Sequence, residues 1–197
     1  MDRESIFGTI LCMFVLIIII KMYFESEMFQ LKCIVSNVNG NTYCVRERSK
    51  APLVADLLAK ISDKMKYLIE HLKEHHNDRE NVQRLVNRFN PKKISETLPT
   101  SKYTAFSENK GQRLAFCTNT KKDGNQLIDE NTLTFVALHE LSHIMTKSIG
   151  HNEEFWSNFR FLIHNAVEID IYKPENYKKF PKSYCGMNIT DNPYYDM

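Results

Sequence analysis

Length, composition and charge indicate one globular domain of ordinary size, because 197 residues that are 43% apolar and 25% charged exclude a disordered or collagen-like chain. The 26 basic side chains are nearly balanced by 24 acidic ones, without the clustered basic excess that neutralises phosphates, so no nucleic-acid partner is expected.

An apolar segment opens the chain. Residues 6–20 read IFGTILCMFVLIIII and carry no charge. The stem of Lys21 can snorkel, which extends the segment to Phe24 and gives roughly 28 Å of helix, close to the length that spans a bilayer. A cleaved signal peptide is the alternative, but the flanking sequences lack a basic n-region and a small-residue cleavage site. We therefore expect an N-terminal transmembrane helix that anchors the protein through residues 6–24.

The side of the membrane on which the remaining chain lies is left open. Arg3 precedes the segment, whereas Lys21 and Lys32 follow it, so the charge bias leans toward a cytoplasmic domain. Four cysteines follow the segment: Cys33, Cys44, Cys117 and Cys185. They could form two disulfides in three pairings, or remain reduced. The glycosylation sequon at residues 188–190 is too common a pattern to decide between the two sides.

Residues 31–46 are expected to form a β-hairpin. Two β-prone runs flank Asn39-Gly40, a dipeptide that tolerates positive φ in a tight turn. One register places Cys33 opposite Cys44, whereas a strict two-residue turn pairs Val35 with Cys44, so the register stays open.

Residues 52–90 are expected to be helical. Pro52 lies near the start of a long helix, where its missing N–H does no harm. The apolar side chains of this helix recur at helical spacing: Leu53, Leu57, Leu58, Ile61, Met65, Leu68, Ile69 and Leu72. Asp78 is expected to cap a second, shorter helix that stops before Pro91.

Residues 91–112 are expected to be irregular. Prolines and a glycine interrupt residues 91–112, whereas residues 113–118 (RLAFCT) alternate as a strand does. Asp123-Gly124 predicts a second turn, with a return strand at residues 127–128.

A helix that is predicted to be buried carries the candidate metal-binding and catalytic residues. Asn131 can cap a helix that runs to about Lys147, and apolar residues cover nearly every side of it. The motif HELSH places His139, Glu140 and His143 in this apolar surface. Two neutral imidazoles one turn apart can chelate one zinc ion, and Glu140 lies where a general base for zinc-activated water is needed.

A catalytic zinc site needs a third protein ligand and an open fourth position. Gly150 is expected to end the helix with positive φ, which turns His151 back toward the first two histidines. Glu168 and His164, on the helix expected next, are the alternative third ligands.

A further helix and an extended tail are expected to complete the chain. Asn152 can cap the helix, and Glu154 in its first turn is expected to be an exposed acid that favours the helix dipole. The tail from Lys173 onward, rich in proline and tyrosine, is predicted to lie as a strap over the core. Tyr184 is a candidate oxyanion stabiliser, although tail tyrosines usually pack with their hydroxyls at the surface.

The sequence HELSH followed by GHNEEFW resembles the active-site region of the WLM and SprT-like zincin metallopeptidases. The longer stretches NTLTFVALHELSHIMTKSIGHNEEFWSNF and YCGMNITDNP resemble uncharacterised, membrane-anchored metallopeptidase-like proteins of large DNA viruses. The resemblance covers roughly residues 31–190 and is strongest over residues 127–160. It implies that His139, His143 and His151 are the zinc ligands and that Glu140 is the catalytic base. It also implies an α+β zincin fold, with a small β-sheet packed on the active-site helix.

The sequence therefore predicts a membrane-anchored zinc metallopeptidase that cuts a peptide or protein substrate at a virion or host membrane. A catalytically silent, membrane-tethered structural or interaction protein that keeps a zinc-stabilised zincin fold is the alternative. The expected organisation is an anchor at 1–24 and a zincin-like domain at 25–197, comprising a hairpin (31–46), a helical part (52–90), a catalytic core (112–170) and an extended tail (171–197).

Overall fold

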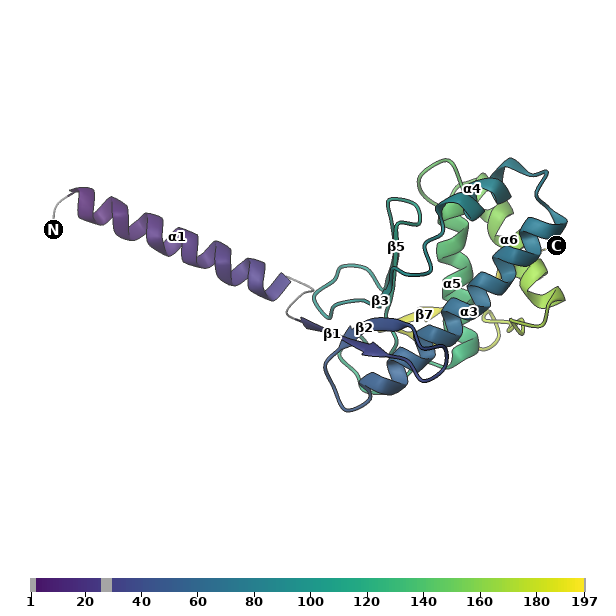
Figure 1. Cartoon of the computed structure of the whole chain (residues 1–197), viewed down its shortest axis with the longest axis horizontal. Coiled ribbons are helices and arrows are strands. Elements are labelled where there is room, and N and C mark those ends of the chain that lie inside the picture. The colour runs from purple at the N-terminus through teal and green to yellow at the C-terminus, as the bar shows by residue number, and fades with distance from the viewer. Residues whose placement is uncertain (1–2, 26–29, 197) are drawn as a thin grey trace.

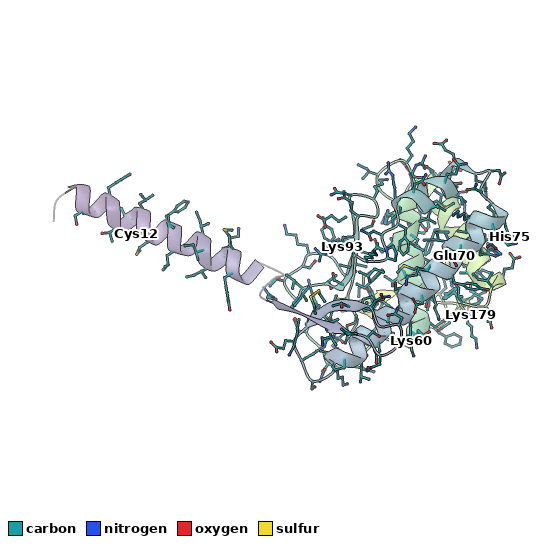
Figure 2. All side chains as sticks on the ribbon, in the orientation of Figure 1. Cys12, Lys60, Glu70, His75, Lys93 and Lys179 are labelled. Carbon is teal, nitrogen blue, oxygen red and sulfur yellow. A yellow bond between two sulfur atoms is a disulfide. The ribbon has the colours of Figure 1, made fainter. Side chains whose placement is uncertain are left out.

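A long apolar helix projects from the rest of the chain (Figure 1). In a computed structural model that describes residues 3–25 and 30–196, this helix, α1, spans Arg3–Glu25. Its stretch Ser5–Tyr23 has a mean hydropathy of 2.5 and is not buried against the protein, and Figure 2 shows the side chains along most of its length standing clear of the other elements. By length and composition the helix could cross a membrane, and a signal sequence would pass the same test.

Strands β1 (Leu31–Val35) and β2 (Thr42–Arg46) form the expected hairpin. The connection is the longer loop 36–41 rather than a strict two-residue turn, and this loop sets the register. Cys33 therefore lies opposite Cys44, and the two form a disulfide.

The main sheet has the strand order β1-β2-β3-β5-β4. Strands β3 (Ile94–Glu96) and β5 (Arg113–Phe116) are parallel to each other, and β3 is also parallel to β2. Strand β4 (Ala105–Glu108) is antiparallel to β5 and lies at the edge. The prediction that residues 91–112 are irregular is therefore wrong, because β3 and β4 are too short for a clear alternation pattern and pair with distant segments. The expected return strand at residues 127–128 is reduced to an isolated bridge between Leu127 and Asn119.

Helices α3 (Ala51–His75) and α4 (Glu80–Arg88) form the expected helical part. Pro52 lies in the first turn of α3, as predicted. Leu53, in contrast, is 58% exposed, because it lies off the buried face of the helix. That face carries Val54, which was not predicted, and the expected residues Leu58, Ile61, Met65, Leu68 and Leu72. Asp78 is not the cap of α4, since the capping position falls on Arg79, whose side chain makes no capping hydrogen bond.

Helix α5 (Glu130–Met145) lies at the centre of the fold and is followed by α6 (Glu153–Glu168). It packs against α3, α4 and α6 and also contacts β4 at the sheet edge (Figure 1). The α+β class, with a small sheet beside the motif helix, is as expected.

The tail contains more regular structure than a simple strap. Strands β6 (Lys182–Tyr184) and β7 (Met187–Ile189) form a separate two-stranded sheet, and a short 3-10 helix spans Pro193–Tyr195. A second disulfide joins Cys185, in the turn of this hairpin, to Cys117 immediately after β5. The tail is thereby linked to the end of β5, the neighbour of the edge strand β4.

The buried carboxylate of Glu96, on the middle strand of the sheet, links β3 to neighbouring segments. Glu96 is fully buried on β3 and accepts a hydrogen bond from the guanidinium of Arg48 at 2.6 Å. The hydroxyl of Thr118 and the backbone N–H of Arg46 donate to the same carboxylate, at 2.7 and 2.8 Å. The charge of Glu96 is therefore compensated by an arginine and satisfied by hydrogen bonds.

Candidate metal centre and active site

The motif helix is buried on nearly every side. Asp129 caps it by accepting a hydrogen bond from the backbone N–H of Thr132 at 2.9 Å, so Asn131 is not the cap that the sequence suggested. Every residue from Thr132 to Met145 is buried except His139 and His143. Solvent therefore reaches this part of the helix at the two histidines.

The chain turns sharply after α5. The helix ends at Met145, earlier than the predicted Lys147, and Gly150 has φ +89° within the loop that follows. Asn152 then caps α6 by accepting a hydrogen bond from the backbone N–H of Phe155 at 3.1 Å. This loop brings His151 back toward α5, as expected.

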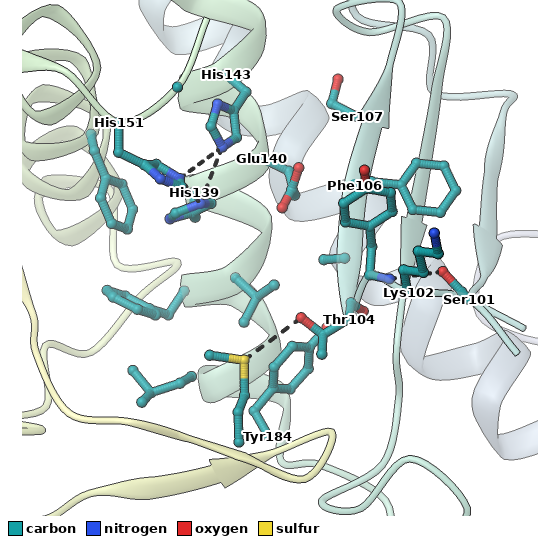
Figure 3. A pocket seen from close by; sticks show the side chains of 18 of the residues that line it. Ser101, Lys102, Thr104, Phe106, Ser107, His139, Glu140, His143, His151 and Tyr184 are labelled. Atoms are coloured by element: carbon teal, nitrogen blue, oxygen red, sulfur yellow. Dashed lines mark hydrogen bonds between the residues drawn. The ribbon is translucent and has the colours of Figure 1, made fainter. Parts of the chain in front are cut away.

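The Nε2 atoms of His139, His143 and His151 converge on one point (Figure 3). The three separations are 3.2 Å between His139 and His143, 3.0 Å between His139 and His151, and 3.1 Å between His143 and His151. In a tetrahedral zinc site with Zn–N bonds of about 2.0–2.1 Å, ligand nitrogens lie roughly 3.3–3.4 Å apart. The triangle therefore fits a zinc ion with one open position.

Hydrogen bonds among the three rings cannot account for this triangle. Each Nε2 atom of a neutral imidazole is either a donor or an acceptor. With three atoms, at least two share the same role, so at least one of the three contacts has no hydrogen bond. A cation that accepts three nitrogen lone pairs satisfies all of them, and these three histidines could therefore bind a metal ion.

The surroundings keep the ligands neutral. Burial, followed by repulsion from the neighbouring histidines, lowers the pKa of His139 to about 3. Burial is also the main reason why the pKa of His143 falls to about 4. The fully buried ring of Phe155 packs against all three imidazoles, with centroid distances of 4.9, 4.5 and 4.6 Å to His139, His143 and His151. Neutral imidazole is the form that coordinates a metal.

Glu140 lies next to the histidines with its carboxylate directed into the space between α5 and β4 (Figure 3). Its side chain is buried, with the residue only 5% exposed, and burial alone raises its pKa to about 8. A carboxyl group with such a pKa can both accept and return a proton near neutral pH.

A cleft of about 1420 Å³ opens in front of these residues. One wall is formed by β4 and the residues before it, and the other by α5, residues 148–151 and the start of α6. The β6–β7 hairpin lines the lower end, as Figure 3 shows for Tyr184. The predicted ligands and Glu140 therefore share one solvent-accessible cleft.

The other candidates lie elsewhere or have other partners. The ring of His164 packs at a tilt against that of Tyr194, with centroids 4.9 Å apart, and neither His164 nor Glu168 belongs to the histidine cluster. The hydroxyl of Tyr184 is not at the surface and donates to the backbone carbonyl of Thr104 at 3.1 Å, so it is committed to a structural contact.

Two residues that hold the 146–148 segment were not identified from the sequence. Glu154, expected to be a plain surface acid, accepts a hydrogen bond from the backbone N–H of Lys147 at 2.8 Å. Lys110 donates to backbone carbonyls of the same segment. The HELSH motif gives no signal for either residue, because both contacts bridge separate elements.

Relatives of the chain occur in viruses. It is 30% identical over 172 residues to uncharacterized protein R325 of Acanthamoeba polyphaga mimivirus, and the match covers 85% of each sequence. The chain belongs to the same family as this mimivirus protein. Two other viral proteins are similar to the chain over shorter stretches. Uncharacterized protein 136R of Invertebrate iridescent virus 6 is 35% identical over 82 residues, or 41% of this chain and 44% of that protein. Uncharacterized protein 042R of Invertebrate iridescent virus 3 is 33% identical over 102 residues, or 52% and 58%. No protein-family profile matches the chain.

Among solved structures, the fold is similar to that of Wss1 from Saccharomyces cerevisiae. The TM-score is 0.50 at 19% sequence identity, and the similar region covers 64% of this chain and 88% of the Wss1 chain. A Wss1 mutant gives the same score and covers 89% of that chain. At this identity the similarity concerns the fold alone, and it agrees with the fold expected from the WLM resemblance.

Proposed function

We propose that the chain is a membrane-anchored, zinc-dependent peptidase. The observation that carries this proposal is the convergence of three Nε2 atoms, 3.0–3.2 Å apart, beside a buried carboxylate in an open cleft. The similarity in fold to Wss1, a WLM-family zinc metallopeptidase, supports it.

In this proposal His139, His143 and His151 hold the ion through their Nε2 atoms. A bound zinc ion supplies a positive charge that polarises a carbonyl, lowers the pKa of water and favours the ionised form of a nearby carboxylate. The carboxylate of Glu140 accepts a proton from the attacking water and later donates it to the leaving amine. Burial of Glu140 raises its pKa, so that the proton can be held between these two events.

The cleft favours an extended peptide as substrate. Strand β4 pairs with β5 on one side, and the residues of β4 line the cleft on the other. An extended chain can add to such an edge through main-chain hydrogen bonds. Beyond the histidines the lining is largely apolar and includes Val136, Phe159, Met187 and Ile189. We therefore propose that a bulky apolar side chain of the substrate occupies this part of the cleft.

The decisive experiment compares the full chain in nonionic detergent with its Glu140→Gln variant. Both are assayed for bound zinc and for cleavage of labelled casein and of a random peptide library. We expect the variant to keep about one zinc per chain and to lose cleavage, because the amide cannot accept the proton. Undiminished cleavage by the variant would contradict the assigned base. A wild-type protein that binds zinc and cleaves neither probe would favour the silent, zinc-stabilised alternative.

For the membrane, we propose that α1 is retained as the anchor and that the domain lies in an oxidising compartment. The helix exposes a continuous apolar surface that lipid would cover. The disulfides Cys33–Cys44 and Cys117–Cys185 are typical of proteins outside the reducing cytosol. The charge bias around the segment leans the other way, but it depends on very few charges.

A further inference from the structure

The segment that precedes His151 in its loop lacks an apolar anchor. Between Thr146, the last buried residue after α5, and Phe155, the first buried residue of α6, no residue is buried. Ile149, the one large apolar side chain in this loop, is 92% exposed. Apart from the contact of the His151 ring with Phe155, hydrophobic packing contributes little to the path of this loop, so polar contacts hold it.

On one side, Lys110 holds the carbonyls of the loop. Its ammonium group donates to the backbone oxygens of Thr146 at 2.7 Å, Ser148 at 2.6 Å and Lys147 at 3.2 Å. An ammonium group has three donors, and here they meet three converging acceptors. A cation at this place also complements the negative end of the α5 dipole.

On the other side, Glu154 holds the amides of the loop. Its carboxylate accepts hydrogen bonds from the backbone N–H groups of Lys147 at 2.8 Å and Ser148 at 3.2 Å, and from the Ser148 hydroxyl at 2.7 Å. Asn152 donates to the same hydroxyl at 2.6 Å. The segment before His151 is thus bound through both its carbonyls and its amides.

The backbone conformation around Lys110 indicates that the β4–β5 turn holds this residue in one place. Asn109 and Lys110 have φ values of +45° and +53°, in the left-handed region that is unfavourable for lysine. Gly111, at φ +109°, packs so closely that an added Cβ would lie 2.6 Å from the carbonyl oxygen of Arg88. The β4–β5 turn is therefore seated against the end of α4, and Lys110 keeps a strained conformation from which it reaches the loop.

We propose that Lys110 and Glu154 are positioning residues that preset His151 for metal binding. This inference rests on the proposed zinc site. Lys110 lies in the turn that follows β4, the strand to which the substrate is proposed to add. It therefore also connects β4 to the loop that carries the third ligand.

The test uses the full chain in detergent and the variants Lys110→Asn and Glu154→Gln. Asparagine removes the ammonium group and tolerates the positive φ better than lysine, so the turn is retained. Lys92→Asn, at an exposed lysine outside the cleft, is the matched control. Zinc affinity is measured by chelator competition, and the visible absorption of bound Co²⁺ reports the ligand geometry.

We expect each of the two variants to lose zinc affinity and to change the Co²⁺ spectrum, with a loss no larger than the roughly 10- to 100-fold that is typical when a group hydrogen-bonded directly to a metal ligand is removed. The double variant should lose less than the product of the single losses, because both residues hold one segment. If the wild type and the two variants bind zinc equally tightly with identical Co²⁺ spectra, the inference is wrong while the proposed function stands. If the wild type binds neither metal, the proposed site itself fails, and the inference with it.

Discussion

Burial of Glu140 makes the stability of the zinc-free protein depend on pH in a way that one substitution can isolate. The pKa of this carboxyl group is raised by burial from its ordinary value of 4.5 to about 8. Between these two values the folded protein holds a proton that the unfolded chain has released. The contribution of Glu140 to stability is therefore fully present below pH 4.5 and is lost as the pH rises to about 8.

The size of this effect on the free energy of unfolding follows from the shift in the pKa of Glu140. At about 1.4 kcal/mol for each pKa unit, a rise from 4.5 to about 8 corresponds to an upper limit of roughly 5 kcal/mol at pH 8. Glutamine at position 140 has a similar shape and no charge. We therefore expect zinc-free Glu140→Gln to be more stable than the wild type at pH 8 by several kcal/mol, and of similar stability near pH 4.5.

The assay is urea unfolding of the full chain in detergent with a chelator present, at several pH values from 4.5 to 8.5. The fluorescence of Trp156, the one tryptophan in the chain, reports unfolding close to the site. His139 and His143 act in the opposite sense, because their lowered pKa values reduce stability as the pH falls below about 6.5. They are present in both proteins, so the difference between the proteins isolates Glu140. A difference that does not change with pH would refute this reasoning.

Three further predictions concern the rest of the chain. The disulfide Cys117–Cys185 closes a loop of sequence separation 68 and should stabilise the fold by roughly 4 kcal/mol. The disulfide Cys33–Cys44 closes a loop of separation 11 and should contribute roughly 3 kcal/mol. Serine pairs at each bridge test this by urea unfolding, and a larger loss at the shorter loop would contradict it. Glu96→Ala should cost about 3–5 kcal/mol in the same assay, because it leaves buried arginine charge unpaired, and a loss below 1 kcal/mol would show that the pair is dispensable. When the chain is expressed in microsomes, the exposed Asn188 of the sequon should receive a glycan, and Asn188→Gln should remove it. The four cysteines of the domain should resist alkylation until they are reduced. Alkylation without reduction would place the domain in a reducing compartment.

The sequence was most informative where local chemistry and periodicity agree. The HELSH motif lies on a helix so apolar that its burial could be predicted, and a buried pair of imidazoles demands compensation. The turn at Gly150 and the capping residue Asn152 predicted the return of His151. The exact cap of α5 was missed, because Asp129 and Asn131 are both good capping residues and the choice depends on contacts in the tail, where Asn131 binds the backbone of Lys173.

Features that depend on distant segments could not be predicted in this way. Strands β3 and β4 are three and four residues long and are defined by pairing with β2 and β5 rather than by their own pattern. The register that joins Cys33 to Cys44 was one of two open choices until the loop length was known. Lys110 lies 36 residues from Thr146, and no local pattern indicates that contact.

The central claim is that one divalent ion is held by His139, His143 and His151. The most direct test is the zinc content of the purified full chain after dialysis, measured beside His151→Ala and His164→Ala. Wild type and His164→Ala should each retain about one zinc per chain, whereas His151→Ala should lose it, because two imidazoles remain. Equal zinc content in His151→Ala and the wild type, or no zinc in the wild type after incubation with the ion, would contradict the account.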